Sequence, residues 1–76
     1  MERRSNVKFT SRGDVARDAR EAKGWTREQE AVLARCSVSL IARFEVEPAY
    51  TPQAPVLLRI CRLLDIDVED VLGALA

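Results

Sequence analysis

The chain has 76 residues, with 12 Lys/Arg and 12 Asp/Glu, so its formal net charge is zero. A chain of this length builds one small domain, and no stretch approaches the roughly 18 consecutive apolar residues that span a membrane. The N-terminus lacks the apolar run of a signal peptide, so we expect a cytoplasmic protein. With no histidine, no glycine-rich phosphate loop and no room for a supported cleft, we expect no enzyme, no cofactor and no small-molecule ligand.

The two cysteines are not arranged as a metal site. Cys36 and Cys61 lie in apolar surroundings and lack Cys-x-x-Cys spacing, and histidine, the other common zinc ligand, is absent. We therefore expect two reduced thiols that pack as small apolar side chains, without a metal or a disulfide.

The zero net charge conceals an uneven distribution. Residues 1–44 carry ten Lys/Arg and six Asp/Glu, a net charge of +4, whereas residues 45–76 carry two and six, a net charge of −4. The basic half begins with an arm over residues 1–11 that has few apolar residues and is expected to be mobile. We assign residues 12–76 to the folded domain, which is a charge dipole with a basic N-terminal half.

The first two predicted helices are defined by their caps. The first begins at Ser11, an N-cap residue, and stops at Gly24, which tolerates a positive φ. The second begins at Thr26, where Gln29 three residues later completes a capping box. This second helix is expected to run to about Ala34.

A third helix is predicted from Ser37, again an N-cap residue, to Glu45. Ile41 and Phe44 lie three residues apart on one face, so we expect both in the core. Two capped helices separated by so short a turn are typical of a helix-turn-helix, in which the helix from Ser37 to Glu45 is the candidate recognition helix.

Two further helices follow a loop that Pro48 keeps out of helical conformation. Thr51-Pro52 predicts the start of the fourth helix, along which apolar residues recur at helical spacing from Leu57 to Leu64. Asp67 caps a last helix that carries apolar residues as far as Leu75. The sequence therefore predicts five helices and no strand.

Two blocks of the sequence match a known family. The first runs from Arg20 to Thr26 and continues through Ala31, Ala34, Ser37, Ser39, Ile41, Arg43, Phe44 and Glu45. The second runs from Pro52 to Leu72. Over residues 12–73 the chain resembles the lambda-repressor-like (Cro/C1-type) helix-turn-helix DNA-binding domains. The resemblance implies an all-α, compact five-helix fold with the helix-turn-helix in helices 2 and 3.

The resemblance also implies that the recognition helix lies in the major groove of double-stranded DNA. Base contacts are expected from Val38, Ser39 and Arg43, with Arg27 in support. Arg43 suits guanine O6 and N7, Ser39 suits a base-edge atom, and Val38 suits a thymine methyl group. Contacts to the DNA backbone are expected from helix N-termini, the turn, the loop before the fourth helix and the basic arm: Thr26, Arg35, Ser37, Tyr50, Thr51, Gln53, Arg12, Lys8, Arg3 and Arg4.

Several residues depart from the family pattern. Glu30 stands where the family has a buried leucine, and because a lone buried carboxylate is costly we expect helix 2 to turn until Leu33 takes over that packing. Arg35 replaces the usual turn glycine and requires an unusual backbone conformation or a rebuilt turn. Trp25 replaces an aliphatic residue and is expected to pack against the protein.

We therefore expect a sequence-specific DNA-binding transcriptional regulator, Cro- or repressor-like, of phage or bacterial origin. Its partner is an operator in double-stranded DNA, and whether it binds as a monomer or a homodimer is left open. The alternative is a helical protein interaction module, antitoxin-like or anti-repressor, on the same fold. The apolar Val32, Val38 and Leu40 motivate this alternative.

Overall fold

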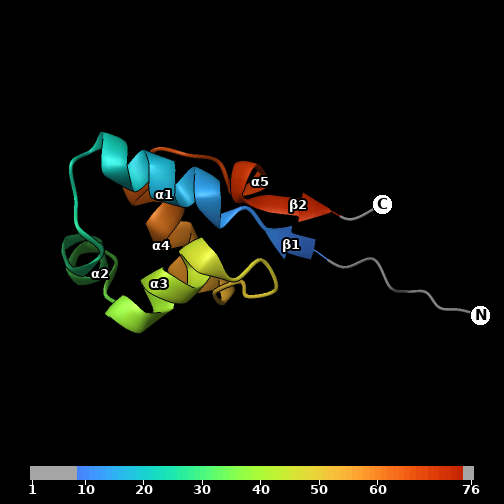
Figure 1. The fold of residues 1–76 in the computed structure, drawn as a ribbon, viewed down its shortest axis with the longest axis horizontal. Coiled ribbons are helices and arrows are strands. Elements are labelled where there is room, and N and C mark those ends of the chain that lie inside the picture. The colour runs from blue at the N-terminus through green and yellow to red at the C-terminus, as the bar shows by residue number, and fades with distance from the viewer. Residues whose placement is uncertain (1–8, 75–76) are drawn as a thin grey trace, which may run out of the picture.

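The computed structural model describes residues 9–74 (Figure 1). Within this range the chain forms five helices and two short strands. The predicted five-helix, all-α fold with its helix-turn-helix in the second and third helices is confirmed, whereas the prediction of no strand is wrong. The elements are β1 (Phe9–Ser11), α1 (Gly13–Ala22), α2 (Arg27–Ala34), α3 (Val38–Val46), α4 (Ala54–Leu64), α5 (Val68–Val71) and β2 (Leu72–Ala74).

An antiparallel strand pair, which the sequence did not predict, joins the two ends of the domain (Figure 1). Phe9 lies opposite Ala74, and Ser11 lies opposite Leu72. The fifth helix therefore ends at Val71, earlier than the apolar pattern indicated. Strands of three residues are too short to give an alternating pattern, and their partner lies at the other end of the chain.

The predicted N-cap at Ser11 is wrong, because Ser11 is the last residue of β1 and α1 begins at Gly13 without a side-chain cap. The Ser11 hydroxyl instead donates to the Tyr50 carbonyl and lies 2.7 Å from Thr51 Oγ1. Its backbone N–H donates to the Pro48 carbonyl over 2.7 Å. Ser11 therefore fastens the loop between α3 and α4 to the N-terminal strand.

The fourth helix begins two residues later than predicted. Its N-cap is Gln53 and its first residue is Ala54, so Thr51 and Pro52 belong to the preceding loop. Pro55 occupies the second helical position, where a backbone N–H has no partner within the helix and its loss costs no hydrogen bond.

The hydrophobic core lies between the helices, with Ile41 and Phe44 fully buried as predicted. Cys61 is buried and Cys36 is half-buried, and both are free thiols. Gly24 follows α1 with a φ of 74°, which confirms it as the residue that ends this helix. The remaining buried apolar residues come from α1, α2, α4 and α5: Ala16, Ala31, Ala34, Leu57, Ile60, Leu64 and Val71.

None of the helices within residues 9–74 has the length and apolar character to cross a membrane. In the same part of the chain, no group of His, Cys, Asp or Glu side chains is arranged to hold a metal ion.

Candidate nucleic-acid interface

Helices α2 and α3 form a helix-turn-helix whose two starts are fixed by side-chain caps. The Gln29 N–H donates to Thr26 Oγ1 over 3.1 Å, and the Thr26 N–H donates to Gln29 Oε1 over 2.8 Å. Ser37 Oγ accepts from the Leu40 N–H over 3.0 Å at the start of α3. The capping box at Thr26 and the N-cap at Ser37 are therefore confirmed, and each helix begins at a defined residue.

The turn between the two helices contains an arginine, Arg35, in the left-handed backbone conformation. Arg35 has φ 59° and ψ 48°, so the turn keeps the geometry that a glycine adopts readily and an arginine does not. Arg59 of α4 supports this turn, because its Nε donates to the Ala34 carbonyl over 2.8 Å. No local pattern in the sequence indicates this role of Arg59, since the carbonyl to which it donates lies on another helix.

The recognition helix α3 divides its residues between the core and solvent. Ile41 and Phe44 are 0% and 1% exposed, whereas Val38, Ser39 and Arg43 are exposed. The three predicted base-reading side chains therefore share the outer side of one helix that is anchored on its inner side. This division is what a helix requires when one face packs and another faces a groove.

Arg43 is held on two sides by residues that follow it. Its Nε and Nη2 lie 3.4 and 3.3 Å from Glu47 Oε1, one helical turn along the chain. Its guanidinium carbon lies 4.2 Å from the centre of the Tyr50 ring. Tyr50, predicted to contact the DNA backbone, thus contacts the predicted base reader.

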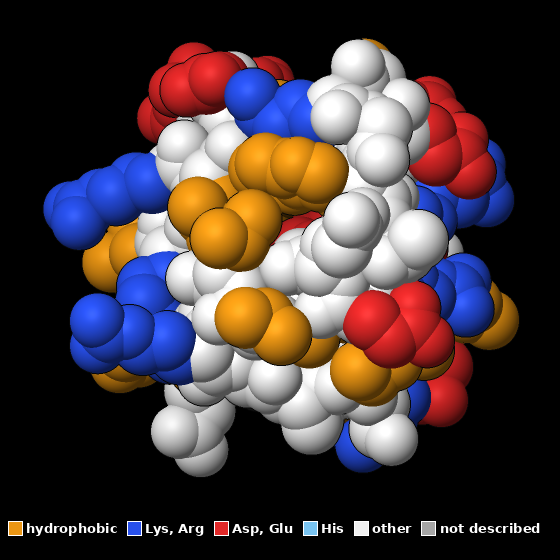
Figure 2. Space-filling view, turned by 90° about the vertical axis from the view of Figure 1, so that its left-hand side faces the viewer, with side chains coloured by type: hydrophobic (Ala, Val, Ile, Leu, Met, Phe, Trp, Pro, Cys, Tyr) orange, Lys and Arg blue, Asp and Glu red, His pale blue; other side chains and the backbone are white. Residues whose placement is uncertain are grey.

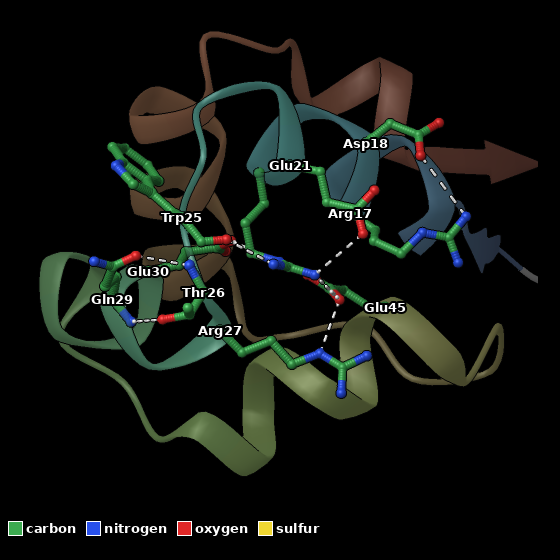
Figure 3. A network of polar contacts seen from close by, with 10 residues as sticks. Arg17, Asp18, Glu21, Trp25, Thr26, Arg27, Gln29, Glu30 and Glu45 are labelled. Atoms are coloured by element: carbon green, nitrogen blue, oxygen red, sulfur yellow. Dashed lines mark hydrogen bonds and ion pairs between the residues drawn. The ribbon is translucent and has the colours of Figure 1, made fainter.

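Glu45 is the centre of a buried ionic network that joins α1, α2 and α3 (Figure 3). Arg20 Nε and Nη2 donate to the two Glu45 carboxylate oxygens over 2.7 and 3.1 Å. Arg20 Nη1 also donates to the Trp25 carbonyl over 2.7 Å, and Arg27 Nε donates to Glu45 Oε1 over 3.0 Å. The hydrogen bond to Glu45 raises the pKa of Arg20 above its usual value. The network fixes the end of α3 relative to α1 and the start of α2.

The predicted rotation of helix 2 is wrong, because Glu30 itself occupies the buried position. Glu30 is 1% exposed, whereas Leu33 is 49% exposed. The capping box at the start of α2 fixes the rotation of the helix about its axis, and Ala31 and Ala34 bury its inner face. A rotation that buried Leu33 would break the capping box and expose the two alanines.

The Glu30 carboxyl is buried with little compensation. Its Oε1 atom has no hydrogen-bond partner among the described residues and lies 4.0 Å from Arg20 Nε. The pKa of Glu30 is raised to about 7, mainly because burial disfavours the charged form and also because Glu45 is negative, while Arg20 opposes the shift. Near neutral pH this carboxyl is therefore protonated in a substantial fraction of molecules.

The predicted phosphate-contact residues lie in different surroundings. Thr26, Arg35, Ser37 and Gln53 are exposed at helix ends and in the turn. Arg12 is exposed, and its Nη2 atom lies 3.4 Å from Asp14 Oδ2. Tyr50 and Thr51 are half-buried and engaged by other residues of the domain. The basic arm residues Arg3, Arg4 and Lys8 lie outside the described residues.

A second exposed surface, which we call the α2 outer surface, is formed by Trp25, Glu28, Gln29, Val32 and Leu33, which line a shallow hollow. Val32 is 77% exposed. Figure 2 shows hydrophobic side chains gathered on this side of the molecule with Lys and Arg side chains beside them. Trp25 is half-buried against the core, as predicted, and Lys23 Nζ lies 5.5 Å from its ring.

The comparison with protein families agrees with this geometry. A family model described as a helix-turn-helix domain matches residues 13–73. The matched range includes all five helices of the structure. No curated protein and no solved structure matches the chain.

Proposed function

The chain belongs to the helix-turn-helix domain family, and from this premise we propose that it is a sequence-specific, Cro- or repressor-like regulator of transcription that binds an operator in double-stranded DNA. The observation that carries the proposal is that α3 buries one side in the core and exposes the other. Its inner residues Ile41 and Phe44 are buried, while Val38, Ser39 and Arg43 are exposed. The Arg20–Glu45 pair holds the helix on the domain, so the exposed side is presented as one rigid element.

In this proposal α3 enters the major groove and reads bases with three side chains. Arg43 donates two hydrogen bonds to guanine O6 and N7, Ser39 bonds a base edge, and the Val38 methyl groups contact a thymine methyl. Arg27 lies at the start of α2 and supports the readout through its bond to Glu45. Only two of these four residues, Ser39 and Arg43, combine an exposed position with the ability to hydrogen-bond a base.

Backbone contacts position the domain and add affinity without sequence information. The exposed candidates are Arg12 at the start of α1, Thr26, Arg35 and Ser37 around the helix-turn-helix, and Gln53 at the start of α4. The N–H groups at the starts of α2 and α3 suit a phosphate oxygen. Glu47 adds negative charge close to this surface. We therefore expect few phosphate contacts and a shallow dependence of affinity on salt, unless the arm residues Arg3, Arg4 and Lys8 add theirs.

Selection of bound duplexes from a random pool tests the proposal. The wild-type protein is expected to select a defined site, and Arg43→Ala is expected to lose discrimination at one base pair by about tenfold or more. Arg62→Ala is a matched control, because it removes an exposed arginine of α4 outside the helix-turn-helix. Enrichment of no common sequence by the wild-type protein would contradict the proposal.

The same selection reports the number of copies on DNA. Two copies on a two-fold symmetric operator would give an inverted repeat with half-sites about one helical turn apart. A monomer would give a single, non-repeated site. Sedimentation of the protein with the selected duplex then measures the stoichiometry directly.

A second candidate function is supported by the α2 outer surface. An antitoxin-like or anti-repressor interaction module would use exposed apolar side chains, and Val32 and Leu33 are 77% and 49% exposed. Val32→Ser and Arg43→Ala separate the two functions. If Val32→Ser abolishes a protein complex while Arg43→Ala leaves all DNA binding unchanged, the interaction module is the better description.

A further inference from the structure

Tyr50 lies against the guanidinium of Arg43, and we propose that Tyr50 positions this arginine for base readout and does not grip a phosphate. The inference rests on the proposed DNA-binding function and assigns a specificity role within it. The distance of 4.2 Å between Arg43 Cζ and the centre of the ring is that of a cation stacked on an aromatic face.

The ring is carried by an anchored loop. The Tyr50 N–H donates to the Glu47 carbonyl over 3.0 Å, which ties the loop to the end of α3. The Tyr50 carbonyl accepts from the Ser11 hydroxyl, which ties the same residue to β1. With its backbone held on both sides, half-buried Tyr50 offers Arg43 a fixed surface.

Stacking leaves the donors of Arg43 available. When the guanidinium lies parallel to the ring, the ring covers one of its faces, whereas hydrogen bonds to guanine leave from its edge and lie in its plane. The Arg43 Nε and Nη2 atoms donate to Glu47 Oε1 along one edge of the guanidinium. Within residues 9–74, Nη1 makes no hydrogen bond. The same stacked arginine can therefore direct Nη1 and the second N–H of Nη2 toward a base.

Glu47 is a weaker constraint than Tyr50. Its distances to Arg43 are 3.4 and 3.3 Å, and the two side chains are 55% and 51% exposed. An exposed ion pair of this kind contributes little and is screened by salt. Glu47 therefore releases Arg43 easily on binding, whereas the stack persists in the bound state.

Positioning has a measurable consequence for specificity. A long, free arginine loses rotamer freedom when it binds, and a stacked arginine has lost part of that freedom already. The benefit is gained only at the base pair that Arg43 reads, because the other contacts do not involve Tyr50. A phosphate grip by the Tyr50 hydroxyl would instead strengthen binding to every duplex equally.

Two substitutions at Tyr50 distinguish these roles. Tyr50→Phe keeps the aromatic face and removes the hydroxyl, and Tyr50→Leu removes the stack. Their affinities are measured for the duplex selected by the wild-type protein and for duplexes altered at the base pair that Arg43→Ala no longer discriminates. Tyr50→Gln is a second variant without the stack, in case Tyr50→Leu does not give a wild-type circular dichroism spectrum.

We expect Tyr50→Phe to keep the wild-type preference within about twofold and Tyr50→Leu to lower it by about two- to fivefold at that base pair only. In an Arg43→Ala background, Tyr50→Leu is expected to have no further effect on preference. A uniform loss of affinity in Tyr50→Phe, or an unchanged preference in both stack-free variants, would overturn the inference while leaving the proposed function intact. A wild-type protein that prefers no duplex would overturn both.

Discussion

Glu30 Oε1 lies 4.0 Å from Arg20 Nε, yet Arg20 donates its hydrogen bonds to Glu45 and to the Trp25 carbonyl. The helix-turn-helix thus contains two buried carboxylates beside one buried guanidinium, and only one of the two is fully paired. Because burial and the neighbouring Glu45 both disfavour a second negative charge, the pKa of Glu30 rises from 4.5 to about 7.

The first prediction concerns the pH dependence of folding. Below pH 4.5 Glu30 is protonated in both the folded and the unfolded chain. Between pH 4.5 and 7 the unfolded chain releases a proton at Glu30 that the folded chain retains. The contribution of Glu30 to the free energy of unfolding therefore falls as pH rises and levels off above pH 7. The fall attributable to Glu30 is expected to reach a few kcal/mol, at about 1.4 kcal/mol per pH unit.

Urea denaturation at several pH values, on the wild-type protein and on Glu30→Gln, checks this expectation. The difference between the two proteins isolates Glu30 from the other carboxylates, and Glu28→Gln, an exposed neighbour on α2, is expected to keep the wild-type profile. Glu30→Leu is expected to be more stable than the wild type at pH 7.5 by about 1–3 kcal/mol. A wild-type pH profile in Glu30→Gln would show that Glu30 does not titrate in this range.

The second prediction concerns the buried ion pair between α1 and α3. Arg20→Met leaves the Glu45 carboxylate buried with only Arg27 as partner and is expected to lower the free energy of unfolding by about 3–5 kcal/mol. Arg17→Met removes an exposed arginine from the same helix and is expected to change stability by less than about 0.5 kcal/mol. Urea midpoints at pH 7 measure both. Equal effects of the two substitutions would argue against a structural role of the pair.

The third prediction concerns the contact between the start of α1 and the end of α3. A Cβ atom on Gly13 would overlap the Phe44 carbonyl oxygen and lie 2.7 Å from the Glu45 Cα atom, and backbone atoms cannot move aside cheaply. Gly13→Ala is therefore expected to lower stability by about 1–3 kcal/mol, as overpacking does in cores.

Thermal unfolding of this variant beside Gly24→Ala gives the comparison. Gly24 has open space around its Cβ position and a φ of 74°, so alanine there is expected to cost about 1 kcal/mol from backbone strain alone. A Gly13→Ala variant as stable as the wild type would mean that α1 and α3 can separate at no cost.

The fourth prediction concerns the left-handed residue of the turn. Arg35→Gly removes the strain of a φ of 59° and is expected to raise stability by about 0.5–1 kcal/mol, the strain relieved less the entropy cost of glycine. In contrast, Ala42→Gly, inside α3, is expected to lower stability by a similar amount.

The same variant tests the role of the Arg35 charge. If Arg35 contacts a phosphate, Arg35→Gly binds DNA more weakly despite its greater stability. The slope of log affinity against log salt concentration then becomes shallower by about one. A gain in stability with unchanged affinity and salt slope would remove Arg35 from the interface.

Signals that act over a few neighbouring residues were readable in the sequence. The capping box of Thr26 and Gln29, the N-cap at Ser37 and the stop at Gly24 each depend on residues within one helical turn, so their types alone predict the geometry. Helical spacing likewise identified Ile41 and Phe44 as core residues.

Features that depend on distant partners were decided by the tertiary structure. Ser11 is a residue type that commonly caps helices, but its hydroxyl instead donates to the Tyr50 carbonyl and lies within hydrogen-bond distance of Thr51 Oγ1. Its backbone is in β1, which pairs with β2, and so is not part of the first helix. Tyr50, predicted to contact the DNA backbone, has its ring against the Arg43 guanidinium, because a turn in which its N–H donates to the Glu47 carbonyl keeps it close to the end of α3.

Glu30 shows the limit most clearly. Its type predicts a solvent-exposed position, and the cost of burying its charge predicted a rotated helix. The capping box and the buried alanines of α2 fix the rotation of the helix about its axis. The Glu30 carboxyl is buried as a result, and its pKa is raised, so that it stays protonated to a higher pH. Sequence by itself determined where the two helices of the helix-turn-helix begin, because the caps at Thr26 and Ser37 are local interactions. Only the tertiary structure decided which polar groups far apart in the sequence are paired, because that pairing depends on which distant atoms come within hydrogen-bond distance.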